Sequence, residues 1–284
     1  MLGEHDMTKT KDRTALKTLQ GTFRNLLTRL RGTKTSSAAL KCEVDSYHIW
    51  LVAKGKFVYL LCNRLAARGS ELLSDINSLL MGPLRVAKHR FDGVPHIRGC
   101  WPAHLCTMEQ ADLLAADLSR LIGGPLGAPG RVPISRTVAD KLRSIVTTTD
   151  SLGVVPSVAA CFEFIVGKGK DSLQVRAEQL PGQLLSLTAL VTNYTSNERT
   201  PKHVVTGTIL MLNYHLAWAR LVQRDHVIEA EVTMPIPSLS TAVWRLSRQA
   251  LCQAVSCRDT LRVVQEPAVA GEIARTFFPQ RRGL

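Results

Sequence analysis

Aromatic residues and long apolar runs are both scarce in this chain. Phe, Trp and Tyr make up 5% of its 284 residues, although apolar residues as a whole make up 45%. We therefore expect a globular protein whose core is built from Leu, Val, Ala and Ile. The longest apolar run, Val154 to Phe162, is too short to cross a bilayer and is followed at once by Glu163. No transmembrane segment is expected.

The chain also lacks an apolar segment after Met1, which predicts that it carries no secretory signal. Its seven Cys residues are an odd number and are scattered along the sequence. This pattern is typical of free thiols in a reducing compartment rather than of a disulfide framework. We expect an intracellular protein that is not secreted.

Catalytic signatures are absent as well. There is no GxSxG nucleophile elbow and no HExxH zinc motif. The segment GKGKDS at 167–172 lacks the spacing of a phosphate loop, and it lies between two expected strands rather than before a helix. We interpret it as a hairpin turn, and we predict that the protein is not an enzyme and needs no cofactor.

Acidic residues are few compared with basic ones. The chain has 23 Asp and Glu against 36 Lys and Arg, which gives a net charge of +13. An excess of this size favours polyanionic partners, either a nucleic acid or an anionic membrane surface. Aromatic stacking platforms are poorly represented, so backbone electrostatics would dominate any nucleic-acid contact.

Part of this charge is concentrated in residues 1–34, where a polar arm precedes an expected amphipathic helix. The apolar stripe of that helix, which could enter a membrane, consists of Leu16, Leu19, Phe23, Leu26 and Leu30. The basic residues that could bind phosphates or anionic lipid are Lys9, Lys11, Arg13, Lys17, Arg24, Arg29, Arg31 and Lys34. The same pattern also suits an ordinary helix that docks on the core with its charged face in solvent.

A second basic cluster and a group of soft metal ligands follow one another between residues 85 and 106. Arg85, Lys88 and Arg90 could contact a polyanion, or they could belong to a solvated loop. The segment Val94 to Cys106 contains His96, Cys100, His104 and Cys106, which together would complete a tetrahedral zinc site. Their crowding into one short segment, with two prolines, instead favours an irregular connector in which Cys100, Trp101, Leu105 and Cys106 pack inward, so we predict no bound metal.

The order of the expected elements indicates an α+β protein. The N-terminal half is expected to be helix-rich, and the C-terminal half to be a mainly antiparallel sheet with flanking helices. We divide the chain into the arm and helix of 1–34, a helix-rich part with one strand over 41–122, and a sheet part over 132–284. A Gly/Pro linker at 123–131 separates the last two, which could also form one compact domain. We find no internal repeat.

Local patterns predict the individual elements. In the first half, 45–57 is expected to be a strand, and 59–81 and 108–122 to be helices, before a shorter helix capped by Thr137 and Asp140. In the second half, strands are expected near 158–166, 172–180, 184–195, 202–216 and 226–236, with a further short strand at 260–265. Ser240 is expected to cap a helix, and a last helix passes through 269–278.

The segment KHVVTGTILMLNYHL, Lys202 to Leu216, is similar to the late strand of rhabdovirus matrix proteins, in which a Gly is followed by alternating apolar residues. A basic N-terminus, the strand SYHIWLVAKGKF and the helix after it resemble the earlier part of the same family, and the size and charge resemble its plant-infecting members. The resemblance covers about a third of the chain. The PPxY and PTAP-like stretches of the family are missing near the start, and the helical section around 107–147 is additional.

This resemblance implies a viral structural protein of the virion that binds RNA or nucleoprotein, associates with an anionic membrane and forms homo-oligomers, with part of its life in the host nucleus or cytoplasm. Our first hypothesis is therefore a non-enzymatic assembly protein that bridges ribonucleoprotein and membrane. The alternative is a soluble nucleic-acid-binding accessory protein of the silencing-suppressor or movement type. A thiol- or zinc-dependent enzyme centred on residues 96–106 is the third hypothesis.

Overall fold

The fold was taken from a computed structural model. The structure describes residues 33–36, 40–44, 47–54, 57–62, 70–80, 82, 84–88, 94–102, 105, 117, 130–149, 152–154, 162–167, 172–194 and 202–277. The expected amphipathic helix within residues 1–34 lies outside these residues, and so does the expected helix at 108–122 apart from Asp117.

Residues 33–102 form the first of two six-stranded antiparallel sheets, with strand order β1-β2-β3-β4-β6-β5. Helix α2 (Ser70–Leu79) connects β4 to β5. We call these elements the N-terminal unit. Its strands are β1 (Thr33–Ser36), β2 (Leu40–Val44), β3 (Tyr47–Lys54), β4 (Phe57–Cys62), β5 (Leu84–Lys88) and β6 (Pro95–Pro102).

Residues 152–235 form the second sheet, with strand order β7-β8-β9-β10-β12-β11. Helix α5 (Lys202–His215) connects β10 to β11. We call these elements the C-terminal unit. Its strands are β7 (Leu152–Val154), β8 (Phe162–Val166), β9 (Leu173–Leu180), β10 (Leu184–Asn193), β11 (Arg220–Arg224) and β12 (Val227–Pro235).

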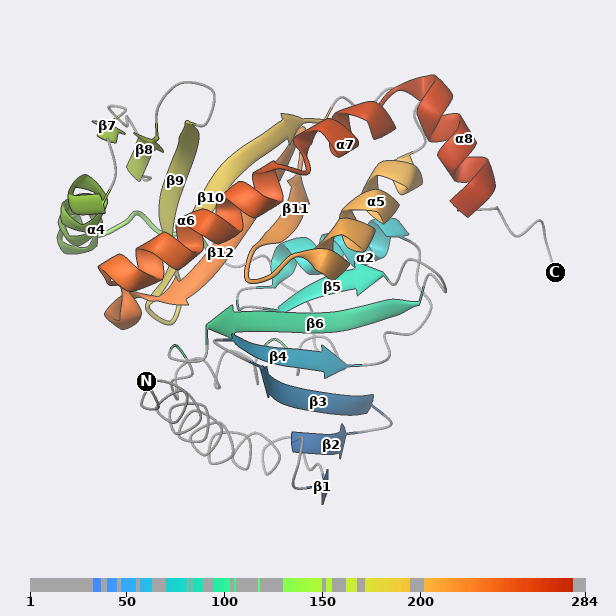
Figure 1. Ribbon diagram of the computed structural model, residues 1–284, viewed down its shortest axis with the longest axis horizontal. Helices are drawn as coiled ribbons and strands as arrows, with labels where there is room; N and C mark the ends of the chain where they lie inside the picture. The colour runs from blue at the N-terminus through green and yellow to red at the C-terminus, as the bar shows by residue number, and fades with distance from the viewer. Residues whose placement is uncertain are drawn as a thin grey trace, which may run out of the picture.

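The remaining helices lie mainly on the C-terminal unit. Helix α6 (Thr241–Val255) crosses the apolar face of the second sheet, and α4 (Arg136–Thr149) packs beside it (Figure 1). Helices α7 (Arg258–Val264) and α8 (Pro267–Phe277) follow α6 along the chain. Burial alternates strictly along β8 of the second sheet, where Phe162, Phe164 and Val166 are buried against this helical layer.

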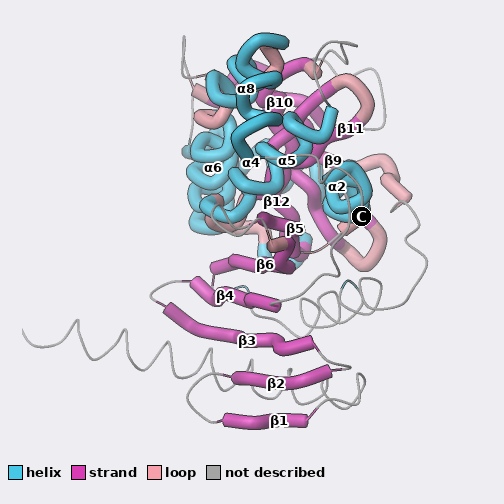
Figure 2. Tube along the Cα trace, turned by 90° about the vertical axis from the view of Figure 1, so that its right-hand side faces the viewer, coloured by secondary structure: helices cyan, strands magenta, loops and turns pink. Residues whose placement is uncertain are grey.

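The first sheet extends away from this layer, and α2 and α5 lie where the two units meet (Figure 2). One continuous cluster of buried side chains runs through both units, from Leu60 and Trp101 in the first sheet to Trp244 in α6. The ring of Trp244 lies 5.6 Å from that of Phe164, centroid to centroid.

The α+β class is confirmed, and so are several elements. The hairpin of β8 and β9, the strands β3, β10 and β12, and the helices α4, α6 and α8 all lie where we expected them. Ser240 caps α6, because its hydroxyl oxygen accepts a hydrogen bond from the Val243 amide. Helix α4 begins at Arg136, and the hydroxyl of Ser135, not of Thr137, accepts the amide of Val138.

Two expected strands are helices instead. The segment 202–216, on which the family resemblance rests, forms helix α5, and 260–265 belongs to helix α7. Helix α5 lies between the two units, so residues Val204 to Leu210 are all buried. A helix buried on most sides has no polar stripe to mark its period, and its β-branched residues then suggest a strand.

The N-terminal unit has more strands than we expected. Residues 41–122 were expected to contain one strand, but β2 to β6 all lie there, and the expected helix at 59–81 is strand β4 followed by the shorter helix α2. Within the segment Val94 to Cys106, which we expected to be an irregular connector, Pro95–Pro102 form strand β6. Short apolar runs such as 57–62 do not distinguish a buried strand from a helix, and only pairing with β3 and β6 decides between them.

Candidate anion-binding face

Most of the basic residues that we expected to bind a polyanion lie outside the described part of the chain. This holds for Arg90, for all residues from Lys9 to Arg31, and for the membrane-insertion candidates between Leu16 and Leu30. The side chain of Lys34, in β1, also lies outside it. Lys88 ends β5 half-buried, and burial lowers its pKa from the usual value.

Arg85 is not an anion-binding residue, contrary to our expectation. Its side chain is only 2% exposed. The guanidinium donates hydrogen bonds to the backbone carbonyls of Leu216, Ala217 and Ala219 in the other unit. Burial lowers the pKa of Arg85 to about 10. The guanidinium is therefore enclosed in the fold and is not available to a phosphate.

Two of the four zinc candidates, His96 and Cys100, lie too far apart to bind one zinc ion. His96 and Cys100 lie on one face of the extended strand β6, so their Cα atoms are about 13 Å apart. A zinc ion lies within about 2.3 Å of each ligand, and these two side chains cannot span that gap along one strand. His104 and Cys106 lie outside the described residues.

Cys100 instead belongs to the core, as we expected for the inward-packing alternative. It is buried together with Trp101 and Leu105, and burial raises the pKa of its thiol. A protonated thiol in the core is neither a metal ligand nor a nucleophile. Among the described residues, no group of three or more His, Cys, Asp or Glu side chains could hold a metal ion.

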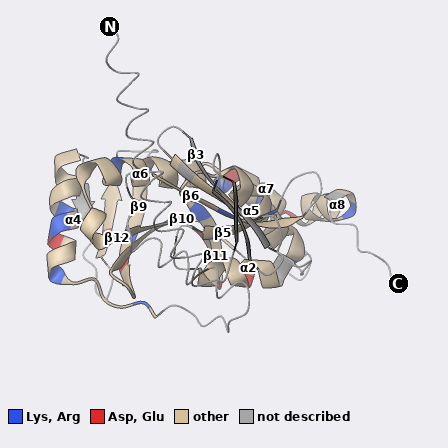
Figure 3. Ribbon diagram, turned by 90° about the horizontal axis from the view of Figure 1, so that it is seen from below, with Lys and Arg blue, Asp and Glu red and all other residues tan. Residues whose placement is uncertain are grey.

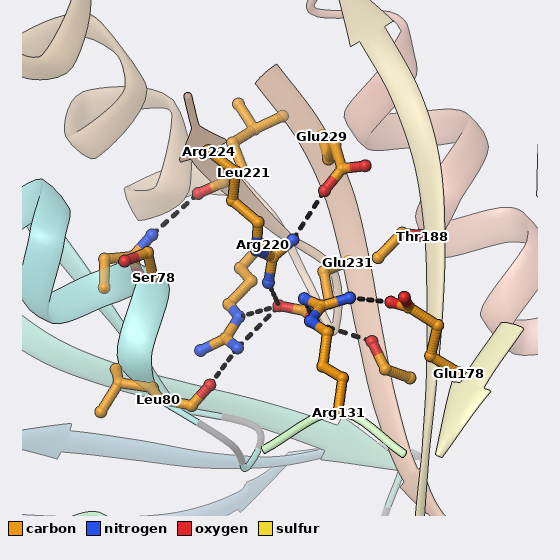
Figure 4. A network of polar contacts seen from close by, with 12 residues as sticks. Ser78, Leu80, Arg131, Glu178, Thr188, Arg220, Leu221, Arg224, Glu229 and Glu231 are labelled. Carbon is orange, nitrogen blue, oxygen red and sulfur yellow. Dashed lines mark hydrogen bonds and ion pairs between the residues drawn. The ribbon is translucent and has the colours of Figure 1, made fainter. Parts of the chain in front are cut away.

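The second face of the C-terminal sheet carries a buried network of charged residues (Figure 4). Arg176, Thr188, Glu231 and Arg220 are directly opposite one another on four neighbouring strands. The network consists of the arginines Arg131, Arg176, Arg220 and Arg224 and the glutamates Glu178, Glu229 and Glu231.

Glu231 is the centre of this network, and it is only 1% exposed. It accepts hydrogen bonds from Nε and Nη2 of Arg220 at 2.9 and 2.7 Å, from Nη2 of Arg224 at 3.0 Å and from the Ser186 hydroxyl at 2.7 Å. Burial alone would raise the pKa of Glu231, but Arg220, Arg224 and Ser186 hold it well below its ordinary value. A carboxylate that is fully ionised and fully hydrogen-bonded is structural and is not an acid–base catalyst.

Helices α4 and α6 provide a different kind of surface. Their five basic residues are opposed by one carboxylate, Asp140, which gives a net charge of +4. Asp140 is already paired with Arg143, at 2.8 Å, and with Arg136, at 3.9 Å. Figure 3 shows basic residues along α4. The five are Arg136, Lys141, Arg143, Arg245 and Arg248.

A cavity of about 270 Å³ opens between these two helices. Thr149 lines it from the end of α4, and Arg245, Arg248, Gln249 and Cys252 line it from α6. Among the described residues, the lining has two guanidinium groups and no carboxylate. Arginine binds phosphate through two parallel N–H donors, so this composition suits an anion rather than a cation or an apolar ligand.

The geometry of α6 explains why these residues meet. Positions 245, 248, 249 and 252 follow the i, i+3, i+4, i+7 spacing and form one stripe of the helix. The buried stripe, which includes Val243, Trp244 and Leu251, faces the sheet on the other side. The arginine stripe is visible in the sequence, and we did not single it out. The contribution of Thr149 from α4 is not visible, because it depends on how the two helices pack.

Comparison with known proteins adds no family to this description: no family model matches the chain, and no curated protein sequence is significantly similar to it. Within the part of the chain that the structure describes, no helix has both the length and the apolar character needed to cross a membrane.

Proposed function

We propose that this protein is a non-enzymatic assembly protein that binds nucleic acid through the face formed by α4 and α6. The observation that carries the proposal is the cavity between these helices, whose described lining contains Arg245 and Arg248 and no carboxylate. Phosphate contacts of this kind supply affinity without reading sequence, which agrees with the high net charge of the chain.

The same face suits nucleic acid better than a membrane. A surface that lies on a bilayer needs exposed apolar side chains beside its cations. The large apolar side chains that are exposed in the described residues are Leu72, Val94, Val132, Leu190 and Val263, and none of them lies on α4 or α6. Of the apolar residues of α4, Val138, Leu142 and Val146 are buried, and Ala139 and Ile145 are half-buried.

The wider role of bridging ribonucleoprotein and an anionic membrane depends on residues 1–34, outside the described part of the chain. The matrix-protein resemblance has lost one of its supports, since its late strand is helix α5. Membrane attachment is therefore a separate proposal. Flotation of the full chain and of a 35–284 variant with phosphatidylserine vesicles tests it, and a full chain that never co-floats at low salt overturns it.

Charge reversal tests the nucleic-acid proposal. We expect Arg245→Glu with Arg248→Glu to weaken binding of single-stranded RNA at least 10-fold, and to reduce the slope of log K against log salt by about 1.4, because about 0.7 is lost for each phosphate contact. The measurement is fluorescence anisotropy with a labelled oligonucleotide over a series of salt concentrations. Circular dichroism and thermal unfolding check that the variant is folded.

The matched control is Arg262→Glu with Arg275→Glu, which makes the same change in net charge on exposed positions of α7 and α8. It should retain most of the affinity and the salt slope. If both double variants weaken binding equally, only net charge matters and the α4–α6 site is refuted. If RNA binding is unchanged while vesicle binding is lost, the face binds membrane instead.

A further inference from the structure

The two units of the chain have the same topology. In each, four antiparallel strands are followed by a connecting helix, an edge strand and a last strand that inserts between the edge strand and the fourth strand. The orders β1-β2-β3-β4-β6-β5 and β7-β8-β9-β10-β12-β11 are thus one order repeated. The connecting helices α2 and α5 and the edge strands β5 and β11 occupy equivalent positions.

Two asparagines on the connecting helices make the same contacts in exchanged roles. Asn77 of α2 accepts the Val86 amide of its own unit at 3.0 Å and donates to the Leu221 carbonyl of the other unit at 2.8 Å. Asn213 of α5 accepts the Leu221 amide of its own unit at 2.7 Å and donates to the Val86 carbonyl of the other at 3.4 Å. It also donates to the Leu221 carbonyl of its own unit at 3.0 Å. Both asparagines are buried, at 1% and 0% exposure.

Two arginines on the edge strands repeat this exchange. Arg85 of β5 donates from Nη1 to the carbonyl of Ala219, directly before Arg220, at 3.2 Å. Arg220 of β11 donates from Nη1 to the carbonyl of Leu84, directly before Arg85, at 3.1 Å. Each arginine also reaches the segment that leaves the connecting helix of the other unit, at Leu216 and Leu80 respectively.

Whole elements also pack across the two units, as these side chains do. Helix α5 of the C-terminal unit packs on β5 of the N-terminal unit, α2 packs on β11, and the two helices contact each other (Figure 1). We infer that the chain is two copies of one self-pairing unit, and that the connecting helix and edge strand of each unit are the docking surface for the other. The chain is thus built as a dimer within one polypeptide.

The two copies have diverged on one side of this surface. Arg85 is opposite Arg98 on the neighbouring strand, whereas Arg220 is opposite Glu231 at the equivalent position. Arg98 turns to the other unit, where it donates to the Tyr214 carbonyl and lies 4.0 Å from the Tyr214 ring centroid. Among the described residues, the ionic network belongs to the C-terminal unit, so the two copies differ in the residues that fill the same topology.

This pairing has a consequence for assembly. Both docking surfaces are occupied inside one chain, so whole chains that self-associate must use other surfaces or exchange units between them. The linker at 123–131 should therefore be dispensable for holding the two units together once the chain has folded.

The test cuts the folded chain between the units. A specific protease site is inserted between Leu126 and Gly127, the purified full-length protein is cleaved, and the products are examined by size-exclusion chromatography and mass spectrometry. We expect both fragments to co-elute at the position of the uncut chain without denaturant. Fragments that elute separately, or that precipitate while the uncut chain stays soluble, overturn the inference.

A variant of the same cut chain shows whether the exchanged contacts hold the units. Asn77→Ala with Asn213→Ala should shift dissociation on dilution, measured by sedimentation velocity, to at least a 10-fold higher concentration. The matched control is Asn193→Ala, at an exposed position at the end of β10. If this control weakens the association as strongly as the double variant, or if the double variant has no effect, these contacts are not the docking surface.

Discussion

Replacing Glu231 by Gln removes one buried negative charge and keeps the shape of the side chain. In the native protein this carboxylate accepts two hydrogen bonds from Arg220, one from Arg224 and one from Ser186. A glutamine retains only one oxygen and points an NH₂ group at guanidinium donors. Because the two arginines stay charged and largely buried, the variant should lose about 3–5 kcal/mol of unfolding free energy, as when one partner of a buried ion pair is removed.

Urea unfolding followed by circular dichroism measures this loss. If the free energy of unfolding falls by about 3 kcal/mol per M of urea, the transition midpoint should fall by roughly 1–2 M. The control is Glu163→Gln on β8, a half-buried carboxylate at the margin of the same sheet face that accepts a hydrogen bond from Gln174. It should change stability by less than about 1 kcal/mol. A Glu231→Gln variant as stable as the control would refute the view that the network depends on this charge.

Two further predictions follow from the same structure. Since the folded state holds the pKa of Glu231 well below its ordinary value of 4.5, the unfolded state takes up protons first as the pH falls below about 4.5. Stability should therefore fall by up to about 1.4 kcal/mol per pH unit there, and an acid titration of Glu231→Gln should lack this component. Gly99→Ala would place a Cβ 2.9 Å from the Trp101 ring and 3.0 Å from Leu84, and should cost about 1–3 kcal/mol in thermal unfolding. Gly130→Ala, whose Cβ would meet no atom of the described residues within 4 Å, should cost almost nothing.

The sequence predicted those helices and strands whose buried residues recur at the spacing of a helix or of a strand. The second sheet shows this at Phe162, Phe164 and Val166, which alternate with less buried residues along β8. The helix α6 shows it too, since Ser240 marks its start and its apolar stripe has helical spacing. These signals need only the neighbouring residues, so they could be interpreted before any tertiary contact was known.

The candidate site was only partly predictable. The charge excess indicated a polyanion partner, but it gave no position for one, because charge counts contain no geometry. Arg85 and Arg245 have the same side chain, yet one is enclosed by carbonyls of the other unit and the other lines an open cavity. Only the packing of distant segments separates these two roles.

The sequence by itself determined the α+β class, the basic character and the start of α6. Tertiary structure decided the rest: that 202–215 is a helix, that 95–102 is a strand whose extension separates His96 from Cys100, and that the two units pair. The physical reason is the same in each case. A segment buried on several sides takes its conformation from partners far along the chain, and a paired topology can persist while the residues that fill it diverge.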